Sequence, residues 1–426
     1  MSPTFRAFKV RNFRLYASGA IVSNVGTWMQ RVAQDWLVLE LTHSGTALGI
    51  VTGLQFLPFL ILAPVTGMIA DRFSKRHILL TTQSFLGLSA LALAALTLTG
   101  HVELWHVYLI AFLQGVATAV DNPARQSFVS EMVPKDRLSN AVALNSASFN
   151  AGRLIGPAVA GLVIAALGTG WALLVNGLSF AFVLASLLAM RVRDLTPAPR
   201  ARGKGQIRQG LAYVRSRPDV MLVMALVFVL GTFGMNFQIT TALMATKEFH
   251  EGPTGYGMLG SIMAIGSLAG ALLAARRKVP RLRVLLIALA GFTVASGIAA
   301  LAPTYEVFAL ALIPTGLASL TALTTANAMV QLSVDAQMRG RVMALYMAVF
   351  MGGTPLGAPI IGWIGDAFGA RWTIGIGTVA VGLSLVAVAA YLYRRHNVRV
   401  RYESHRRPRF TVTTAPLDTP APEAVR

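Results

Sequence analysis

Four residues in the first apolar stretch of the chain are spaced so that their side chains can act together. Asn24, Trp28, Arg31 and Asp35 occupy positions i, i+4, i+7 and i+11, which places them on one stripe of a helix. Arg31 and Asp35 lie one turn apart and can form an ion pair. Such a pair can bind a polar substrate, or protonation of Asp35 can release Arg31 and shift the balance between two conformations.

The surroundings of this stripe determine the free-energy cost of burying its charges. Hydrophobic residues make up 55% of the 426-residue chain, charged residues make up 13%, and the mean hydropathy is +0.61, which is far more apolar than a soluble domain. A charge in hydrocarbon is costly unless it faces protein or water, so we expect the stripe to face a central passage. The alternative is that Asp35 lies near the outer end of its helix and both charges snorkel to the membrane surface.

Apolar runs of about 20 residues recur along the chain, and each can cross a hydrocarbon layer roughly 30 Å thick as an α-helix. Lipid offers no partner to open backbone groups, so the spans must be helices or a closed barrel. The runs are too long and too uniformly apolar for barrel strands. The sequence predicts an all-α membrane protein with twelve transmembrane helices, at 13–39, 46–70, 78–99, 104–124, 139–168, 171–190, 219–243, 256–275, 284–302, 305–331, 341–365 and 373–393.

The formal charge of +20 is distributed unevenly over this map. Of the 37 Lys and Arg residues, 33 fall on one side, Lys247 and Arg371 on the other, and Arg31 and Arg153 within spans. This asymmetry indicates that both termini are cytoplasmic and that the basic loops touch anionic lipid, in preference to nucleic acid. Because the first 14 residues are polar and basic and no cleavage site follows, we expect no removable signal.

The sequence offers little for enzyme chemistry. It contains no cysteine, and its seven histidines are scattered without metal-ligand spacing, so we expect no metal site. "GYGMLG" (255–260) fits GxGxxG, but it opens a span and follows no strand, so it does not indicate a dinucleotide site. No GxxxxGK[ST] loop is present, and we expect no cofactor and an ion gradient as the energy source.

The spans divide six and six around a polar, proline-containing segment with eight basic residues. This predicts a bundle at 1–190, a cytoplasmic linker at 191–217, a second bundle at 218–395 and a disordered cytoplasmic tail at 396–426. The halves also echo one another at an offset of 201, where "GRLIGPAVAG" (152–161) corresponds to "GTPLGAPIIG" (353–362). A repeat of this kind is typical of secondary transporters with a shared central site.

"GMIADRFSKR", between the second and third spans, resembles the signature loop of the major facilitator superfamily. Gly67, Asp71, Arg72, Lys75 and Arg76 match, and Ser74 replaces the second glycine. "GRLIGPAVAG" resembles the antiporter motif of the fifth span, which is associated with exporters, with Ala160 in place of one glycine. Wider stretches over residues 5–395 resemble the bacterial branch that includes the enterobactin exporter and macrolide efflux proteins. The arginine of the drug/proton antiporter motif of the fourth span is replaced by Ala111.

The resemblance implies the major facilitator fold and two functional segments. Residues 67–76, together with Asp121 and Arg125, would form a cytoplasmic gate; the alternative is a basic loop that only sets topology. Gly152, Gly156, Pro157 and Gly161 would let helices pack closely and bend, in gating or in ordinary packing.

Further polar residues within spans either bond between helices or touch substrate. Met343, Met347 and Met351 can form a flexible apolar wall or serve as plain packing. The predicted substrate and proton pathway comprises Asn24, Trp28, Arg31, Asp35, Gln114, Asn145, Asn150, Arg153, Asn236, Gln238, Asn327 and Gln331.

These observations favour a monomeric secondary transporter of the bacterial cytoplasmic membrane, and not an enzyme. It would export a small amphipathic molecule of the drug or siderophore type in exchange for protons. Two alternatives stay open, namely an importer or facilitator of the same fold, and a non-transporting membrane sensor or assembly protein that uses its tail for protein contacts.

Removal of residues 396–426 separates the transporter from the sensor. We expect the shortened chain to transport at the full-length rate in proteoliposomes, because the tail lies beyond the last span. Loss of the protein's activity on this deletion would instead support the sensor.

Overall fold

The computed structural model describes residues 3–196, 206–277, 280–396, 399–403 and 409–413. A 3-10 helix, η1 (Pro3–Lys9), precedes the first six long helices. These are α1 (Arg11–Thr42), α2 (Gly45–Arg72), α3 (Lys75–Leu98), α4 (Leu104–Met132), α5 (Lys135–Leu167) and α6 (Thr169–Leu188). A short 3-10 turn, η2 (Val192–Asp194), follows them, and each long helix contains one expected span.

The second half holds the other six spans. Its first span is divided into α8 (Pro218–Val229), the π-helical turn η3 (Leu230–Gly234), α9 (Phe237–Leu243) and a second π-helical turn, η4 (Met244–Glu248). The others are α10 (Pro253–Ala275), α11 (Leu282–Ala300), α12 (Tyr305–Ser333), α13 (Ala336–Ala367) and α14 (Ala370–His396). The hydropathy of the sequence predicts one unbroken helix at 219–243, without this interruption.

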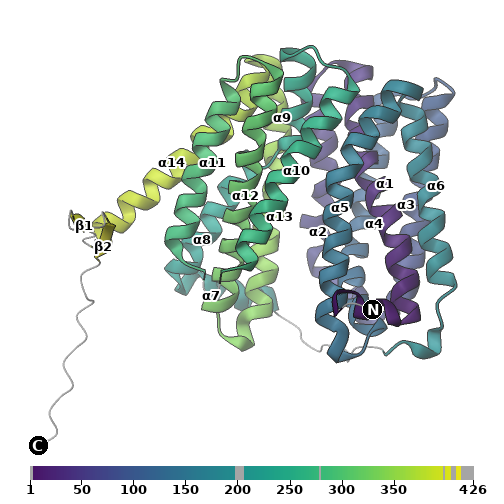
Figure 1. Cartoon of the computed structure of the whole chain (residues 1–426), viewed down its shortest axis with the longest axis horizontal. Coiled ribbons are helices and arrows are strands. Elements are labelled where there is room, and N and C mark those ends of the chain that lie inside the picture. The colour runs from purple at the N-terminus through teal and green to yellow at the C-terminus, as the bar shows by residue number, and fades with distance from the viewer. Residues whose placement is uncertain (1–2, 197–205, 278–279, 397–398, 404–408, 414–426) are drawn as a thin grey trace, which may run out of the picture.

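Among the described residues, eleven segments are long and apolar enough to cross a membrane. The twelfth spanning helix is α1, which fails that test because the polar residues of its stripe lower its hydropathy. It runs alongside the other long helices and packs on α5 and α6 (Figure 1). The prediction of twelve transmembrane helices in two bundles is confirmed.

Two segments differ from their sequence-based description. The linker contains a helix, α7 (Gln206–Ser216), which packs on α13. Beyond α14, the strands β1 (Arg399–Glu403) and β2 (Arg409–Thr413) pair antiparallel, although we expect disorder there. Their alternating β-branched and aromatic residues favour extended structure. Residues 404–408 and 414–426 lie outside the described part of the chain.

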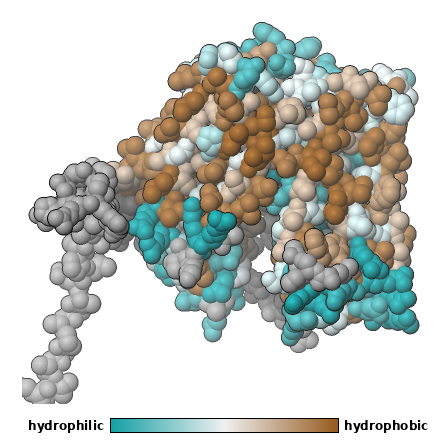
Figure 2. Space-filling model, in the orientation of Figure 1, coloured by the Kyte–Doolittle hydropathy of each residue, from teal (hydrophilic) through white to brown (hydrophobic). Residues whose placement is uncertain are grey.

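Helices α1–α6 and α8–α14 form two bundles that lie side by side (Figure 1). A hydrophobic band crosses both bundles and is bordered by hydrophilic residues at each end (Figure 2). We name the end that carries η1, α7 and the α2–α3 connection the basic end, and the end that carries the α1–α2 and α13–α14 connections the opposite end.

The repeated glycines bring helix backbones together in equivalent ways. A Cβ on Gly156 would lie 2.6 Å from Trp28 Cβ of α1, and a Cβ on Gly357 would strike the carbonyl oxygen of Thr232 in η3. The third glycine of each repeat instead meets the other bundle. A Cβ on Gly161 would lie 2.6 Å from Pro253 O, and one on Gly362 would strike Gly45 O. The repeat in sequence is therefore also a repeat of contacts.

The bundles meet towards the opposite end, where α2 packs on α13 and α5 packs on α10. Among the described residues, hydrogen bonds between the bundles lie only from mid-depth to this end. Towards the basic end the surface is hollowed between the bundles (Figure 2). The molecule is therefore closed at one end and open at the other.

Replacement of Gly357 by valine tests the role of these glycines. Because the obstructing atom is backbone, we expect the Gly357→Val protein to lose about 1–3 kcal/mol of stability, measured as a lower Tm in detergent. Gly340→Val is the matched control, since a Cβ there meets nothing within 4 Å. Equal effects of the two substitutions would contradict the close-packing argument.

Candidate functional site

Asp35 lies where the two bundles meet. Its side chain is buried, with 2% of the residue exposed, and its Oδ2 accepts a hydrogen bond of 2.9 Å from the Tyr256 hydroxyl of α10. The neighbouring Trp36 stacks on the Tyr256 ring with centroids 6.3 Å apart. The stripe on α1 therefore faces protein at this level. A position among acyl chains or at the membrane surface does not fit this environment.

Arg31 does not form the ion pair that the sequence suggests. Within the described residues, no nitrogen of Arg31 approaches a carboxylate oxygen within 4.0 Å. Its guanidinium carbon lies 4.8 Å from the centroid of the Trp28 ring and 5.9 Å from that of Phe56 on α2. Side chains on a helix lean towards its N-terminus, so the Arg31 guanidinium lies against the Trp28 ring one turn earlier in α1. The Asp35 carboxylate instead accepts a hydrogen bond from Tyr256.

Arg153 of α5 completes a cluster around Trp28. Its guanidinium carbon lies 5.7 Å from the Trp28 centroid, and its Nη2 donates to Ser267 Oγ of α10 at 3.3 Å. One turn nearer the basic end on α1, Asn24 Nδ2 donates a hydrogen bond to Ser148 Oγ of α5 at 3.0 Å. The structure thus brings together four of the predicted pathway residues on α1 and α5, at the face towards the other bundle.

The other predicted pathway residues are dispersed. Asn236 donates to Thr232 O at 2.7 Å, and its buried Oδ1 has no partner in the described structure. The remaining side chains bond within or between neighbouring helices, or are partly exposed without a hydrogen bond among the described residues. They are Gln114 (to Ser89), Asn150 (to Ser146 O), Gln331 (to Asn327), Asn145 and Gln238.

The basic residues of the signature loop fasten the first bundle at the basic end. Lys75 pairs with Glu131 of α4, Arg76 Nε donates to Leu187 O at the end of α6 at 2.8 Å, and Arg72 is exposed. Gly67 and Asp71 lie in α2, but the surroundings of Gly67 and the side chain of Asp71 are outside the described part of the structure. No contact of this loop with the second bundle is seen among the hydrogen bonds of the described residues.

The predicted gate residues on α4 belong to a buried network inside the first bundle. Asp121 is 3% exposed and accepts hydrogen bonds from Thr82 Oγ1, Gln83 Nε2 and Arg125 Nε at 2.7–2.8 Å. The network joins α3 to α4, so in this conformation these residues stabilise the bundle itself.

Asp366 is a site residue outside the set predicted from the sequence. Its carboxylate accepts from Gly45 N at 2.7 Å, from Thr46 N at 2.8 Å, and from the hydroxyls of Ser44 and Thr46. Lys247 Nζ lies 2.6 Å from its Oδ1. A carboxylate of α13 thus caps the N-terminus of α2 across the bundle interface. The signal in the sequence is a Ser-Gly-Thr helix start at one end of the molecule, but nothing local points to Asp366.

Two bundles of six membrane-spanning helices, related by an internal repeat and joined at one end, define a transporter of the major facilitator superfamily. The family model described as "Transmembrane secretion effector" matches residues 2–416, and the chain belongs to this family.

Several relatives have names that describe their activity. The chain is 23% identical to the staphyloferrin A transporter of Staphylococcus aureus, covering 92% of this chain and 99% of that protein. It is 27% identical to the multidrug efflux pump Tap of Mycolicibacterium fortuitum, with coverage of 83% and 89%. It is 23% identical to the enterobactin exporter EntS of Citrobacter koseri, with coverage of 92% and 93%.

Solved structures share the fold. A bacterial homologue of the human lysosomal transporter Spinster, in an inward-facing and unoccupied conformation, superposes with a TM-score of 0.65 at 16% identity, covering 92% of this chain and 96% of that one. A mutant of the nucleoside transporter NupG superposes with a TM-score of 0.70 at 13% identity, covering 89% of this chain and 99% of that one.

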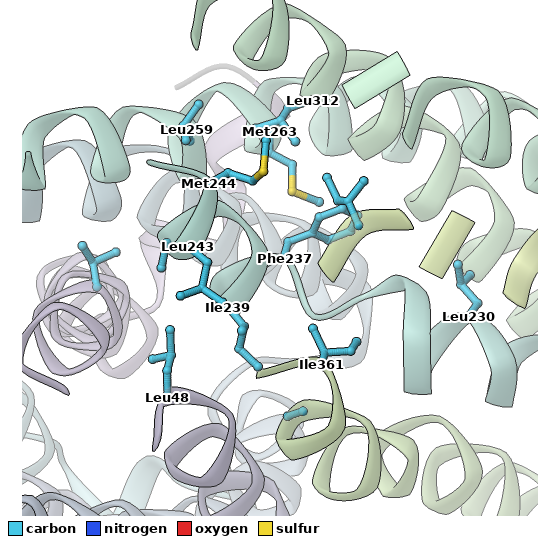
Figure 3. Packing of buried hydrophobic residues seen from close by; sticks show 14 of the residues in the cluster. Leu48, Leu230, Phe237, Ile239, Leu243, Met244, Leu259, Met263, Leu312 and Ile361 are labelled. Carbon is cyan, nitrogen blue, oxygen red and sulfur yellow. The ribbon is translucent and has the colours of Figure 1, made fainter. Parts of the chain in front are cut away.

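Removal of the Asp366 charge tests the contact at the opposite end. In Asp366→Asn, we expect the closed arrangement to weaken by about 1–3 kcal/mol, because charge-assisted bonds to the α2 terminus are lost. The chain has no natural cysteine, so Leu48→Cys can report on opening. Leu48 of α2 is fully buried in one cluster with Ile239 and Ile361 of the second bundle (Figure 3).

The rate of maleimide labelling at Cys-substituted position 48 should rise several-fold in Asp366→Asn. The control is Asp194→Asn, which removes a carboxylate whose ion pair within the described part of the chain is with its exposed neighbour Arg193 at the basic end. Equal labelling rates in both backgrounds would show that the Asp366 cap does not hold the bundles together.

Proposed function

We propose that this protein is a secondary active transporter that exports a small amphipathic molecule in exchange for protons. It acts as a monomer in the bacterial cytoplasmic membrane, with both termini in the cytoplasm. The excess of Lys and Arg at the basic end supports this orientation, because positively charged loops are typical of the cytoplasmic side of a membrane protein. The open side of the structure then faces the cytoplasm, where an exporter loads its substrate.

One observation carries the proposal. The two bundles are joined by close backbone contacts and hydrogen bonds towards one end, and they separate towards the other. Because both repeats use equivalent glycines for these contacts, a rocking motion can exchange the closed and open ends without unfolding either bundle. In the second state, residues 67–76 at the basic end would meet the second bundle.

Export of a drug-like or siderophore-like compound is supported by the relatives. One is named as an enterobactin exporter and another as a multidrug efflux pump. The cluster around Trp28 offers aromatic and polar groups side by side, which suits an amphipathic molecule.

Asp35 is the proposed site of proton coupling. It is a buried carboxylate at the bundle interface, and it accepts a hydrogen bond from Tyr256 of the other bundle in this conformation, in which the opposite end is closed. Separation of α1 from α10 would remove that donor and change the tendency of Asp35 to hold a proton. A proton that binds one conformation more tightly than the other drives the exchange between them.

Asp35→Asn tests the coupling. In proteoliposomes subjected to a pH jump and supplied with a panel of drugs and siderophores, we expect the variant to lose proton-driven exchange by at least about tenfold, because position 35 can no longer change its charge. Its Tm should stay close to that of the wild type, since asparagine can still accept from Tyr256.

The control variant is Asp136→Asn, whose carboxylate is largely exposed at the start of α5. Unchanged coupling in Asp35→Asn would rule out this residue as the protonation site. A wild-type protein that moves no member of the panel outward, or moves it without a proton gradient, would contradict the proposed exporter.

A further inference from the structure

Two arginines share one aromatic ring at the interface of the bundles. Arg31 of α1 and Arg153 of α5 lie 4.8 Å and 5.7 Å from the centroid of Trp28, measured from each guanidinium carbon. The approach of the two helices depends on glycine, since a Cβ on Gly152 would lie 2.8 Å from the carbonyl carbon of Asn24. The fold therefore holds two like charges close together at membrane depth.

Neither charge is neutralised by direct contact. Seven ion pairs occur among the described residues, and neither arginine takes part in them. Asp35 attracts Arg31 from one turn away, but it is bound to Tyr256. Each guanidinium has five N–H donors. Among the described residues, Arg153 uses one of them on Ser267 and Arg31 donates no hydrogen bond. The cluster has a net positive charge and many unused donors.

The position of the cluster makes it accessible to a transported molecule. Both arginines are partly exposed. Arg31 lies one turn before Asp35 on α1, on the basic-end side of the Asp35–Tyr256 contact, and Arg153 of α5 lies beside it at the Trp28 ring. This is the direction in which the bundles diverge (Figure 2). Arg153 also reaches Ser267 of the second bundle, so a ligand that binds it would act directly on an inter-bundle bond.

Aromatic side chains surround the two charges. Phe149 of α5 packs edge-on against Trp28 with centroids 5.8 Å apart, and Phe56 of α2 flanks Arg31. Half of Phe149 is exposed, so it can contact a ligand. A planar anion beside an aromatic ring would satisfy the guanidinium donors in bidentate fashion and stack on these side chains.

We propose that Arg31 and Arg153 bind an anionic group of the transported molecule, while Trp28, Phe56 and Phe149 hold its aromatic part. This inference rests on the proposed transport function and narrows its substrate to aromatic organic anions, such as carboxylates or ionised catechols. A lipophilic cation would meet two positive charges and no free carboxylate in this cluster, which disfavours it.

Isothermal titration calorimetry on the full-length protein in neutral detergent tests the charge preference. The probes are 1-naphthoate and 1-naphthylmethylammonium, which share a ring system and differ in the sign of their charge. We expect 1-naphthoate to bind at least about tenfold more tightly, because only the anion can accept from the guanidinium groups. Equal affinity, preference for the cation, or failure to bind 1-naphthoate would overturn the proposal.

Single substitutions then locate the site. Arg31→Gln and Arg153→Gln should each weaken 1-naphthoate binding about tenfold, and the Lys variants at the same positions should retain part of the affinity. Arg137→Gln, which alters a partly exposed arginine at the start of α5, is the control and should bind normally. Normal binding by both Gln variants, or complete displacement of 1-naphthoate by an equal concentration of chloride, would refute the assignment.

These measurements are independent of the proton-exchange experiment. Titration is performed at equilibrium without a gradient, so anion binding can be established in a protein that proves not to exchange protons. Conversely, proton-driven export of cations alone would refute the anion site while leaving the proposed exporter intact.

Discussion

The cost of an unsatisfied polar group in hydrocarbon shapes this molecule more than any other interaction. Asp35 is bound by Tyr256, Asp121 by three donors, and Asp366 by a helix terminus and a lysine. Two of these three carboxylates join the bundles and the third joins helices within one bundle. The polar residues of the membrane interior are therefore also the residues that set how the helices are arranged.

Small residues make that arrangement attainable. Where Gly156 and Gly357 meet α1 and η3, a larger side chain would push the helices apart and move polar groups out of hydrogen-bonding range. Gly161 and Gly362 serve the same purpose between the bundles. Tight backbone packing and buried hydrogen bonds support each other, because each requires the separation that the other provides.

The sequence predicts the features that depend on local composition. Hydropathy places the twelve spans within a few residues, and the glycine repeat predicts the paired bundles. The predicted fourth span ends at residue 124, whereas α4 continues to Met132. The polar residues between Arg125 and Met132 continue the helix without a hydrophobic signal. The partner of Asp35 is 221 positions away in Tyr256, and that of Asp366 is about 320 away in α2, so neither contact leaves a trace in local spacing.

The first span of each repeat has a different construction. In the first bundle, α1 is a continuous helix of 32 residues that carries Arg31 and Asp35. In the second, the corresponding span contains two π-helical turns and a break at Asn236. Between Asp219 at its start and Lys247 near its end, this span has no ionisable acidic or basic residue. The internal repeat is thus asymmetric in construction, since one copy supplies a continuous helix that bears charge and the other supplies a helix broken by π-helical turns whose interior is uncharged.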